Sequence, residues 1–306
     1  MRSLVGLTML VVVSFVGMGV LAFGQEAEAK NAPAQAATAP AQTVIAPAQT
    51  VIAPAQDRNL TGVLSEEAFK ALHDLKEGEA PKLLGKDIEI EGAGKAYLSL
   101  PEGKKGPLSA VIVIHEWWGM NDHVKHYTDR FASLGYAALA IDLYGGQVAK
   151  TRDDAMKFMQ SVDEAKAVEV VKAAHTFLLT DGRVKATKTA SVGWCFGGRW
   201  SQRCAIELPE LDAAVIYYGQ PLTDPAMLGK IKCPVLGIYG SKDRGIPPTS
   251  VAELDKALTE AKVVHTFHSY DAEHAFANPS NPKYDATSAE DAFQKVKAFF
   301  AEHLGK

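Results

Sequence analysis

The sequence predicts an α/β fold with a mostly parallel central sheet and helices on both of its faces. Short apolar runs alternate with longer segments of helical periodicity, which is the pattern of strands joined by crossover helices. Residues 110–114 are continuously apolar and residues 136–141 form a second apolar run, as expected of strands buried on both faces. Candidate catalytic side chains also follow several predicted strands directly, where ligands bind in such sheets.

The chain begins with the pattern of a secretory signal peptide at 1–24. One positive charge precedes the apolar run 4–23, which ends in the small-residue pattern Ala22-Phe23-Gly24. We expect cleavage after Gly24 and export to the periplasm or the medium. An uncleaved membrane anchor is the alternative, because the apolar run is long.

Residues 25–56 predict a linker rich in Ala, Pro and Gln. A seven-residue pattern starts at 39, recurs at 46 and begins again at 53. The proline in every repeat excludes a continuous helix, so we expect an extended tether. The folded domain is then 57–306, and its roughly 250 residues suit one large domain.

The elements of that domain follow from periodicity and from the residues that interrupt it. Residues 87–90 and 96–100 alternate between apolar and polar side chains, as edge strands do. Gly135 ends one helical pattern, and Pro234 interrupts a strand pattern. The predicted helices cover 64–75, 121–134, two segments within 152–179, 198–206, 249–261 and 286–303, and the predicted strands cover 87–90, 96–100, 110–114, 136–143, 189–194, 211–218, 231–239 and 263–269.

Composition narrows the classes of partner. The formal net charge of −4 and the lack of a dense basic stretch argue against a nucleic-acid partner. Three cysteines are too few for a disulfide scaffold. We therefore expect a monomer that acts on a small molecule, with the N-terminal segment as a membrane tether if it is not cleaved.

A candidate nucleophile lies in the segment Gly193-Trp194-Cys195-Phe196-Gly197-Gly198, between the strand at 189–194 and a helix. Strand, tight turn and helix form a nucleophile elbow, here with Cys195 where serine is commoner. The glycines let strand and helix pass closely, and the helix N-terminus favours a thiolate and later an oxyanion. The alternative is a buried cysteine in a glycine-rich turn.

A base and its acidic partner follow later strands in the order that this arrangement requires. Asp243 follows the strand at 231–239, and His274 follows the strand at 263–269. We predict that His274 is the general base and then the acid, and that Asp243 pairs with its imidazolium. Asp243 could instead cap the next helix. The spare acids are Asp224, Asp271 and Glu273.

Other candidates have structural interpretations. The backbone N–H groups of Phe196 and Trp117 are the predicted oxyanion hole. His123 and His126 have a spacing suited to ligands on a helix, but no third ligand is near in sequence. We favour a solvent-facing helix surface there, and we expect no metal and no organic cofactor. Cys204 and Cys233 are expected in the core, while Trp117, Trp118, Trp194 and Phe196 could line an acyl pocket or belong to the core.

These motifs together resemble the dienelactone hydrolase family (carboxymethylenebutenolidases), which has the α/β-hydrolase fold. The resemblance spans residues 85–300, nearly the whole folded domain. The segments that carry it are His115-Glu116-Trp117-Trp118-Gly119-Met120-Asn121, Asp142-Leu143-Tyr144, Gly193-Trp194-Cys195-Phe196-Gly197-Gly198, Tyr239-Gly240-Ser241-Lys242-Asp243 and His274-Ala275-Phe276-Ala277-Asn278.

The resemblance implies two further roles. Glu116 would lie near the cysteine and help to generate its thiolate; the alternative is a structural acid bonded to loop amides. Arg152 would hold a substrate carboxylate; the alternative is an exposed arginine at a helix start. The family's second arginine, four residues after the catalytic histidine, is Asn278 here, so Asn278 is the substrate-binding candidate at that position. Trp118, in the loop after a predicted strand, is a further substrate-binding candidate. Either Arg199 or Arg244 could compensate.

The chemistry of a cysteine nucleophile restricts the substrate. Thiolate is a good leaving group, so a tetrahedral adduct on Cys195 reverts unless the substrate's own leaving group departs readily. We expect hydrolysis of activated esters or enol lactones through an acyl-cysteine. The alternatives are a broad-specificity exported carboxylesterase or thioesterase, and a tethered ligand-binding homologue without turnover.

Overall fold

The computed structural model describes residues 82–305 of the chain. The signal peptide, the linker and the helix expected at 64–75 lie outside the described residues, and they stay predictions. Within 82–305, no helix combines the length and the apolar character needed to cross a membrane.

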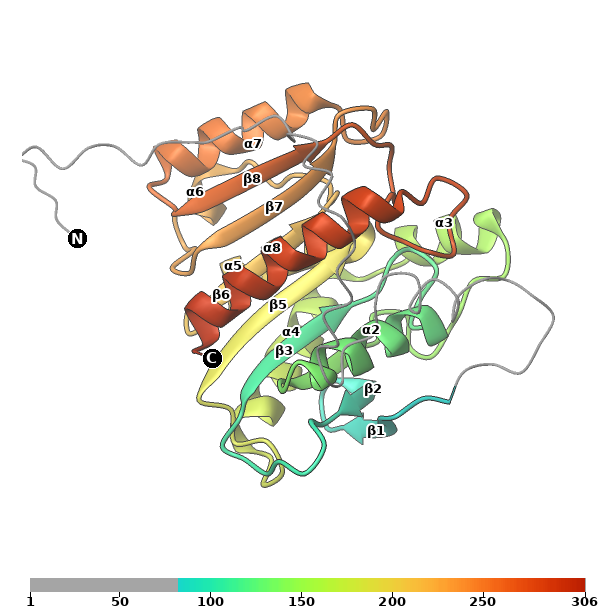
Figure 1. Ribbon diagram of the computed structural model, residues 1–306, viewed down its shortest axis with the longest axis vertical. Helices are drawn as coiled ribbons and strands as arrows, with labels where there is room; N and C mark the ends of the chain where they lie inside the picture. Colours follow the sequence, from blue (N-terminus) through green and yellow to red (C-terminus); the bar gives the residue numbers. More distant parts are fainter. Residues whose placement is uncertain (1–81, 306) are drawn as a thin grey trace, which may run out of the picture. The chain divides into compact units, whose positions relative to one another are not determined.

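Eight strands form one sheet in the order β1-β2-β4-β3-β5-β6-β7-β8 (Figure 1). β2 pairs antiparallel with β1 and with β4, and every other neighbouring pair is parallel. This confirms the predicted mostly parallel sheet. The strands are β1 (Lys86–Ile90), β2 (Gly94–Ser99), β3 (Ser109–Ile114), β4 (Ala137–Ile141), β5 (Lys188–Trp194), β6 (Ala213–Tyr217), β7 (Val235–Gly240) and β8 (His265–Tyr270).

Helices cover both faces of the sheet, because successive strand residues point to opposite sides. Ile112 of β3 packs in the hydrophobic cluster that contains Ala205 of α5, whereas Val113 packs in the cluster that contains Phe131 of α2. α4, α5 and α7 belong to the first cluster, and α2 and α8 to the second. The helices are α2 (Asp122–Ser133), α3 (Arg152–Gln160), α4 (Glu164–Thr180), α5 (Phe196–Glu207), α6 (Pro225–Leu228), α7 (Pro248–Glu260) and α8 (Ala286–Leu304).

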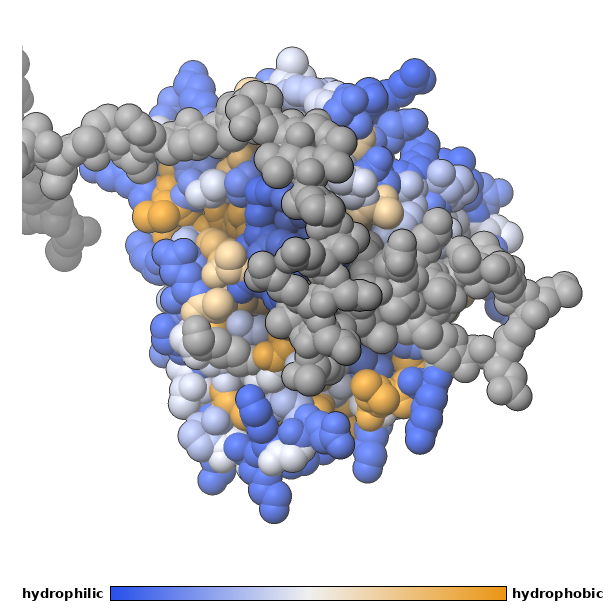
Figure 2. Space-filling model, viewed as in Figure 1, coloured by the Kyte–Doolittle hydropathy of each residue, from blue (hydrophilic) through white to orange (hydrophobic). Residues whose placement is uncertain are grey.

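Several elements differ from the predictions. β2 lies between β1 and β4 rather than at an edge, because the sheet continues through an antiparallel pair there. β4 is shorter than the strand predicted at 136–143, and β7 begins at Val235, after Pro234, rather than at 231. α6 was not predicted, because a four-residue helix is too short to show a period; it is opened by the Asp224 carboxylate. On the face shown in Figure 2, the uncovered surface is mostly hydrophilic, with apolar side chains in small separate groups.

In the turn between β5 and α5, backbone atoms approach one another too closely for a side chain to fit. A Cβ atom on Gly193 would lie 2.1 Å from the carbonyl oxygen of Gly197, and one on Gly197 would lie 2.2 Å from the carbonyl oxygen of Ile114. Cys195, between them, has φ 55° and ψ −114°. A non-glycine residue persists in this region only where its surroundings enforce it. The crossing of helix and strands therefore holds the cysteine at the end of β5.

We predict that Gly197→Ala destabilises the domain by about 2–3 kcal/mol, since an added methyl group must displace the backbone of β3. Urea unfolding followed by circular dichroism measures the effect. Gly182→Ala is the matched control, because a Cβ atom at Gly182 meets nothing within 4 Å. Equal unfolding midpoints for the two variants would show that the crossing tolerates a side chain.

Candidate active site

The candidate nucleophile, base and acid lie after three parallel strands of the sheet. Cys195 follows β5, Asp243 follows β7 and His274 follows β8. All three line one cavity of about 650 Å³. Because the carboxyl ends of parallel strands meet at one edge of the sheet, residues far apart in sequence converge there.

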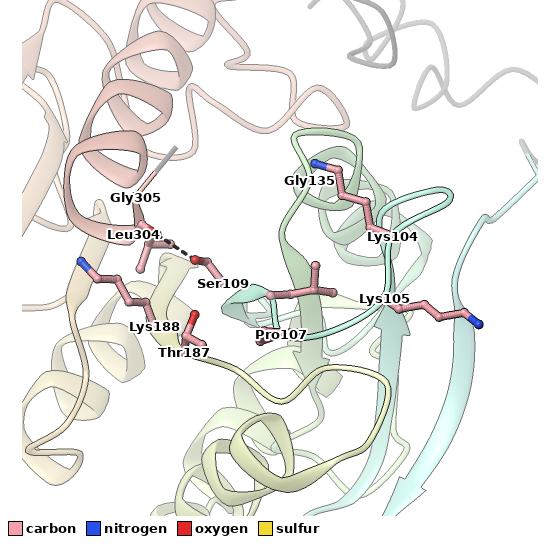
Figure 3. A pocket seen from close by; sticks show the side chains of 10 residues that line it. Lys104, Lys105, Pro107, Ser109, Gly135, Thr187, Lys188, Leu304 and Gly305 are labelled. Atoms are coloured by element: carbon pink, nitrogen blue, oxygen red, sulfur yellow. Dashed lines mark hydrogen bonds between the residues drawn. The ribbon is translucent and has the colours of Figure 1, made fainter.

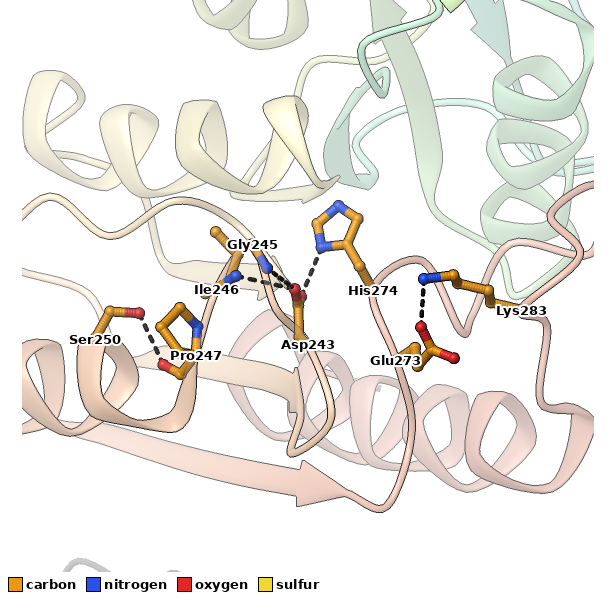
Figure 4. Close-up of polar contacts among 8 residues, drawn as sticks. All are labelled: Asp243, Gly245, Ile246, Pro247, Ser250, Glu273, His274 and Lys283. Carbon is orange, nitrogen blue, oxygen red and sulfur yellow. Dashed lines mark hydrogen bonds and ion pairs between the residues drawn. The ribbon is translucent and has the colours of Figure 1, made fainter.

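The buried Asp243 pairs with the partly exposed His274, as Figure 4 shows. Nδ1 of His274 lies 2.6 Å from Oδ2 of Asp243. The other oxygen, Oδ1, accepts hydrogen bonds from the backbone N–H groups of Gly245 (2.8 Å) and Ile246 (2.9 Å). Since α7 begins at Pro248, Asp243 does not cap that helix. Oδ1 of Asp243 therefore holds the backbone of the loop after β7, and Oδ2 orients the imidazole of His274.

The protonation of this pair follows from its partners. Burial raises the pKa of Asp243, but the hydrogen bond and charge of His274 outweigh burial, so the pKa falls below its usual value. Burial likewise lowers the pKa of His274, but Asp243 and Cys195 outweigh it and raise the pKa to about 10. Nδ1 of the imidazole is therefore the donor to an ionised Asp243.

The three other acidic residues that could have paired with His274 form contacts with different groups. Asp224 accepts from the N–H of Ala226 at the start of α6. Asp271 pairs with Lys242 at 2.8 Å, and Glu273 pairs with Lys283. None of the three contacts His274 by a hydrogen bond or an ion pair within the described chain.

Glu116 lies in the loop after β3 and lines the same cavity. It is 5% exposed, and its Oε2 accepts a hydrogen bond from the side chain of Asn278. Burial raises the pKa of Glu116 to about 7, against the opposing effects of His274, Asn278 and Tyr218. Glu116 therefore accepts its hydrogen bond from a side-chain amide. The structural alternative had expected it to bond to backbone amides of the loop. A carboxyl with this pKa exchanges its proton near neutral pH.

Asn278 differs from its expected place as a substrate-binding residue. It is buried and does not line the cavity. Its amide donates to Glu116, and its oxygen accepts from the N–H of Ser280. The short side chain ends at Glu116, so it reaches the cavity only through that carboxyl.

The lining of the cavity combines apolar and basic side chains. Trp117, Trp118 and Met159 supply apolar surface. Arg152 also lines the cavity, with its guanidinium 5.8 Å from the ring centroid of Trp117. Trp194 and Phe196, by contrast, are buried in the core.

The structure separates the two arginines that could compensate for Asn278. Arg244 lines the cavity. Arg199 pairs with Glu164 of α4 at 3.3 Å and lies outside the cavity lining. Lys283 also lines the cavity, but its ammonium is engaged by Glu273. Met159 and Lys283 could not be identified from the sequence as residues of the cavity, since neither belongs to a motif.

Tyr218 is a further residue of the site that was not predicted from the sequence. It follows β6, has φ 36° and is fully buried, with its ring centroid 5.1 Å from that of His274. Its hydroxyl lies near Glu116 and lowers the pKa of that carboxyl, although no hydrogen bond of good geometry forms. Its position at the end of a predicted parallel strand is the sequence feature that could have marked Tyr218 as a residue of the site.

The two predicted oxyanion donors belong to elements that meet at the cavity. Phe196 follows Cys195 directly and is the first residue of α5, so its N–H has no acceptor within the helix. Trp117 lies in the turn after β3 and lines the same cavity as Cys195. Among the hydrogen bonds of residues 82–305, neither N–H has an acceptor, so both stay candidates for stabilising an oxyanion.

His123 and His126 are buried in α2, which corrects the predicted solvent-facing surface. His123 packs edge-on against the ring of Tyr127, with the centroids 5.1 Å apart. Within residues 82–305, no group of three or more His, Cys, Asp or Glu side chains is arranged to hold a metal ion. Cys204 and Cys233 are buried, as predicted.

A second cavity of about 590 Å³ lies at the opposite end of the strands, beside the first residues of β3 and β5. Its lysines Lys104, Lys105 and Lys188 point in different directions (Figure 3). Lys188 donates to the carbonyl oxygen of His303 at 2.7 Å. The cavity thus lacks a convergent acid and base.

Known proteins resemble this chain over most of its described residues. The family model described as "Dienelactone hydrolase family" matches residues 95–304. "Protein usf" of Aquifex pyrophilus is 34% identical over 233 residues, which cover 72% of this chain and 100% of that protein. The "Putative carboxymethylenebutenolidase" of Yersinia pestis is 32% identical over 224 residues, covering 68% of this chain and 83% of that protein.

A solved structure extends the similarity to three dimensions. The crystal structure of a dienelactone hydrolase-like promiscuous phosphotriesterase from metagenomic libraries has a TM-score of 0.67 and 28% sequence identity with this chain. The match covers 72% of this chain and 98% of that one. The likeness therefore extends over nearly the whole of that structure.

We predict that Glu116→Gln changes the pH dependence of stability. A buried carboxyl whose pKa is raised from 4.5 to about 7 stabilises the fold fully below pH 4.5, and this contribution is lost as the pH rises through 7. The stability of the wild type should fall by about 3 kcal/mol relative to the variant across that interval. Urea unfolding at pH 4.5, 6, 7 and 8 measures it. Parallel curves would contradict the raised pKa.

Proposed function

Since this chain belongs to the dienelactone hydrolase family, as its motifs predict, we propose that it hydrolyses activated esters or lactones through an acyl-cysteine on Cys195. The observation that carries the proposal is the strained cysteine at the end of β5, in one cavity with the His274–Asp243 pair. Membership of the family makes the protein a hydrolase, and the proposal adds its nucleophile and substrate class.

The first half of the proposed reaction transfers the acyl group. The thiolate of Cys195 attacks the carbonyl carbon, and the oxyanion accepts hydrogen bonds from the N–H groups of Trp117 and Phe196. The C–O bond to the leaving group then breaks, and His274 donates a proton to the departing oxygen. The raised pKa of His274 suits this step, since the imidazole holds the proton beside the sulfur.

The second half consumes water. His274 accepts a proton from a water molecule, which attacks the thioester carbon. The adduct collapses with loss of the Cys195 thiolate and releases the carboxylic acid. Asp243 keeps the same tautomer of the imidazole through both steps. The proton of Cys195 is thus held by His274, while Glu116, which lines the same cavity with a pKa of about 7, can exchange a proton with groups in the cavity near neutral pH.

The cavity favours a substrate that carries an anion on an apolar body. Trp117 and Trp118 offer ring surfaces to an unsaturated or aromatic acyl group. Arg152 and Arg244 bring positive charge to the same cavity. A guanidinium binds a carboxylate through paired hydrogen bonds, so we propose that these two arginines hold an acidic group on the substrate.

Two other functions remain as outcomes of the test. A broad-specificity carboxylesterase or thioesterase would also cleave plain alkyl esters or thioesters. A tethered ligand-binding homologue would cleave none. The phosphotriesterase activity named for the solved relative makes an aryl phosphotriester a useful fourth substrate.

We predict turnover of an aryl acyl ester and of a dienelactone, little turnover of an alkyl ester, and loss of all turnover in Cys195→Ala. Steady-state rates with the full chain measure this, with an alkyl thioester and an aryl phosphotriester completing the panel. Cys233→Ala is the matched control, because its buried thiol lies outside the cavity lining. A folded wild type that cleaves nothing would favour the binding role, and turnover that survives in Cys195→Ala would exclude the acyl-cysteine.

We predict that Arg244→Gln raises KM about 10-fold for an aryl ester bearing a carboxylate, because a hydrogen bond to a charged group is lost. KM for the matched neutral ester should stay within about 2-fold. Arg199→Gln, which removes an arginine outside the cavity lining, should change neither value. Equal effects of Arg244→Gln on both esters would exclude a role in binding the anion.

A further inference from the structure

His115 is a fully buried imidazole that the proposed reaction does not use. It stands between the last residue of β3 and Glu116, and it has no exposed surface. An imidazole removed from water needs hydrogen-bond partners for both ring nitrogens, or burial costs free energy. Its partners therefore indicate its role.

The two partners determine which nitrogen carries the proton. Nδ1 lies 2.6 Å from the carbonyl oxygen of Glu116, which can only accept. Nε2 lies 3.1 Å from the backbone nitrogen of Leu143, which can only donate. His115 is thus a neutral ring with its proton on Nδ1. Burial, against weaker effects of Glu116 and Asp142, lowers its pKa and keeps it neutral.

The first hydrogen bond orients one predicted oxyanion donor. The carbonyl of Glu116 and the N–H of Trp117 belong to the same peptide unit, and in a trans peptide they point in opposite directions. Holding the carbonyl at Nδ1 therefore fixes where the N–H of Trp117 points. The same carbonyl accepts from the N–H of Gly119 at 3.2 Å, which closes the turn.

The ring also packs against the second predicted donor. His115 stacks on the ring of Phe196, with centroids 5.5 Å apart and an interplanar angle of 18°. The other neighbour of the ring is Tyr144, edge-on at 4.6 Å. Through Leu143 and Tyr144 the imidazole is tied to the loop after β4, so it connects three loops at the carboxyl end of the sheet.

We propose that His115 is a positioning residue that sets the geometry of the oxyanion hole, by holding the Glu116–Trp117 peptide and the Phe196 turn at once. The proposal rests on the proposed acyl-cysteine function. It predicts that His115 matters for attack on a carbonyl and not for the reactivity of the sulfur itself.

Two reactions of Cys195 separate these effects. Acylation by an aryl ester forms an oxyanion, whereas alkylation by iodoacetamide displaces iodide and forms none. In His115→Leu we expect acylation to slow about 100-fold, by analogy with loss of one oxyanion donor. Alkylation should change by less than about 3-fold. In His115→Asn, whose amide can donate near the position of Nδ1, part of the acylation rate should return.

His175→Leu is the matched control. His175 is another buried histidine, bonded to the hydroxyl of Thr189 at 2.9 Å and located on α4. Its loss should cost stability and leave the acylation rate unchanged. Circular dichroism and unfolding midpoints show whether each variant folds. Acylation and alkylation falling together in His115→Leu and His115→Asn, or neither falling, would overturn the proposal.

Nitrogen NMR of the imidazoles tests the hydrogen bonds without any reaction. We expect His115 to keep its proton on Nδ1 from pH 5.5 to pH 9. A proton on Nε2, or titration within that interval, would overturn the proposal. If wild-type Cys195 is alkylated by iodoacetamide but is never acylated by any ester, the proposed function has failed, and the tautomer then separately tests how His115 holds the peptide.

Discussion

The close crossing of α5 over β5 and β3 is the contact on which the rest of the site depends. Gly193 and Gly197 let backbone atoms approach where any side chain would collide. This contact keeps Cys195 at a positive φ, as the residue directly before the first turn of α5. The strain is confined to one residue and is offset by the packing of the sheet and helix around it.

Two carboxyl groups near the cysteine have opposite electrostatic environments. Asp243 receives two backbone N–H groups and His274, and these outweigh its burial. Glu116 receives one amide from Asn278, and its burial prevails. One group is therefore suited to holding a charge beside the imidazole, and the other to exchanging a proton near neutral pH. Divergent pKa values of neighbouring acids are typical of sites that move protons.

Neutral polar side chains hold the loops of this site together. Asn278 reaches Glu116 where the family's arginine would bring a charge. Without that charge, less opposes the rise in the pKa of Glu116, and positive charge in the cavity comes from Arg152 and Arg244 instead.

The sequence by itself determined the fold class, the order of most elements and the placement of Cys195, Asp243 and His274 after parallel strands. These depend on local periodicity and on the rule that such strands end at one edge of the sheet. Only the tertiary structure decided which way side chains point: Asn278 toward Glu116, Arg244 into the cavity and Arg199 away from it. The direction of a side chain depends on packing between segments that are far apart in the sequence, and the periodicity of a single segment does not contain that information.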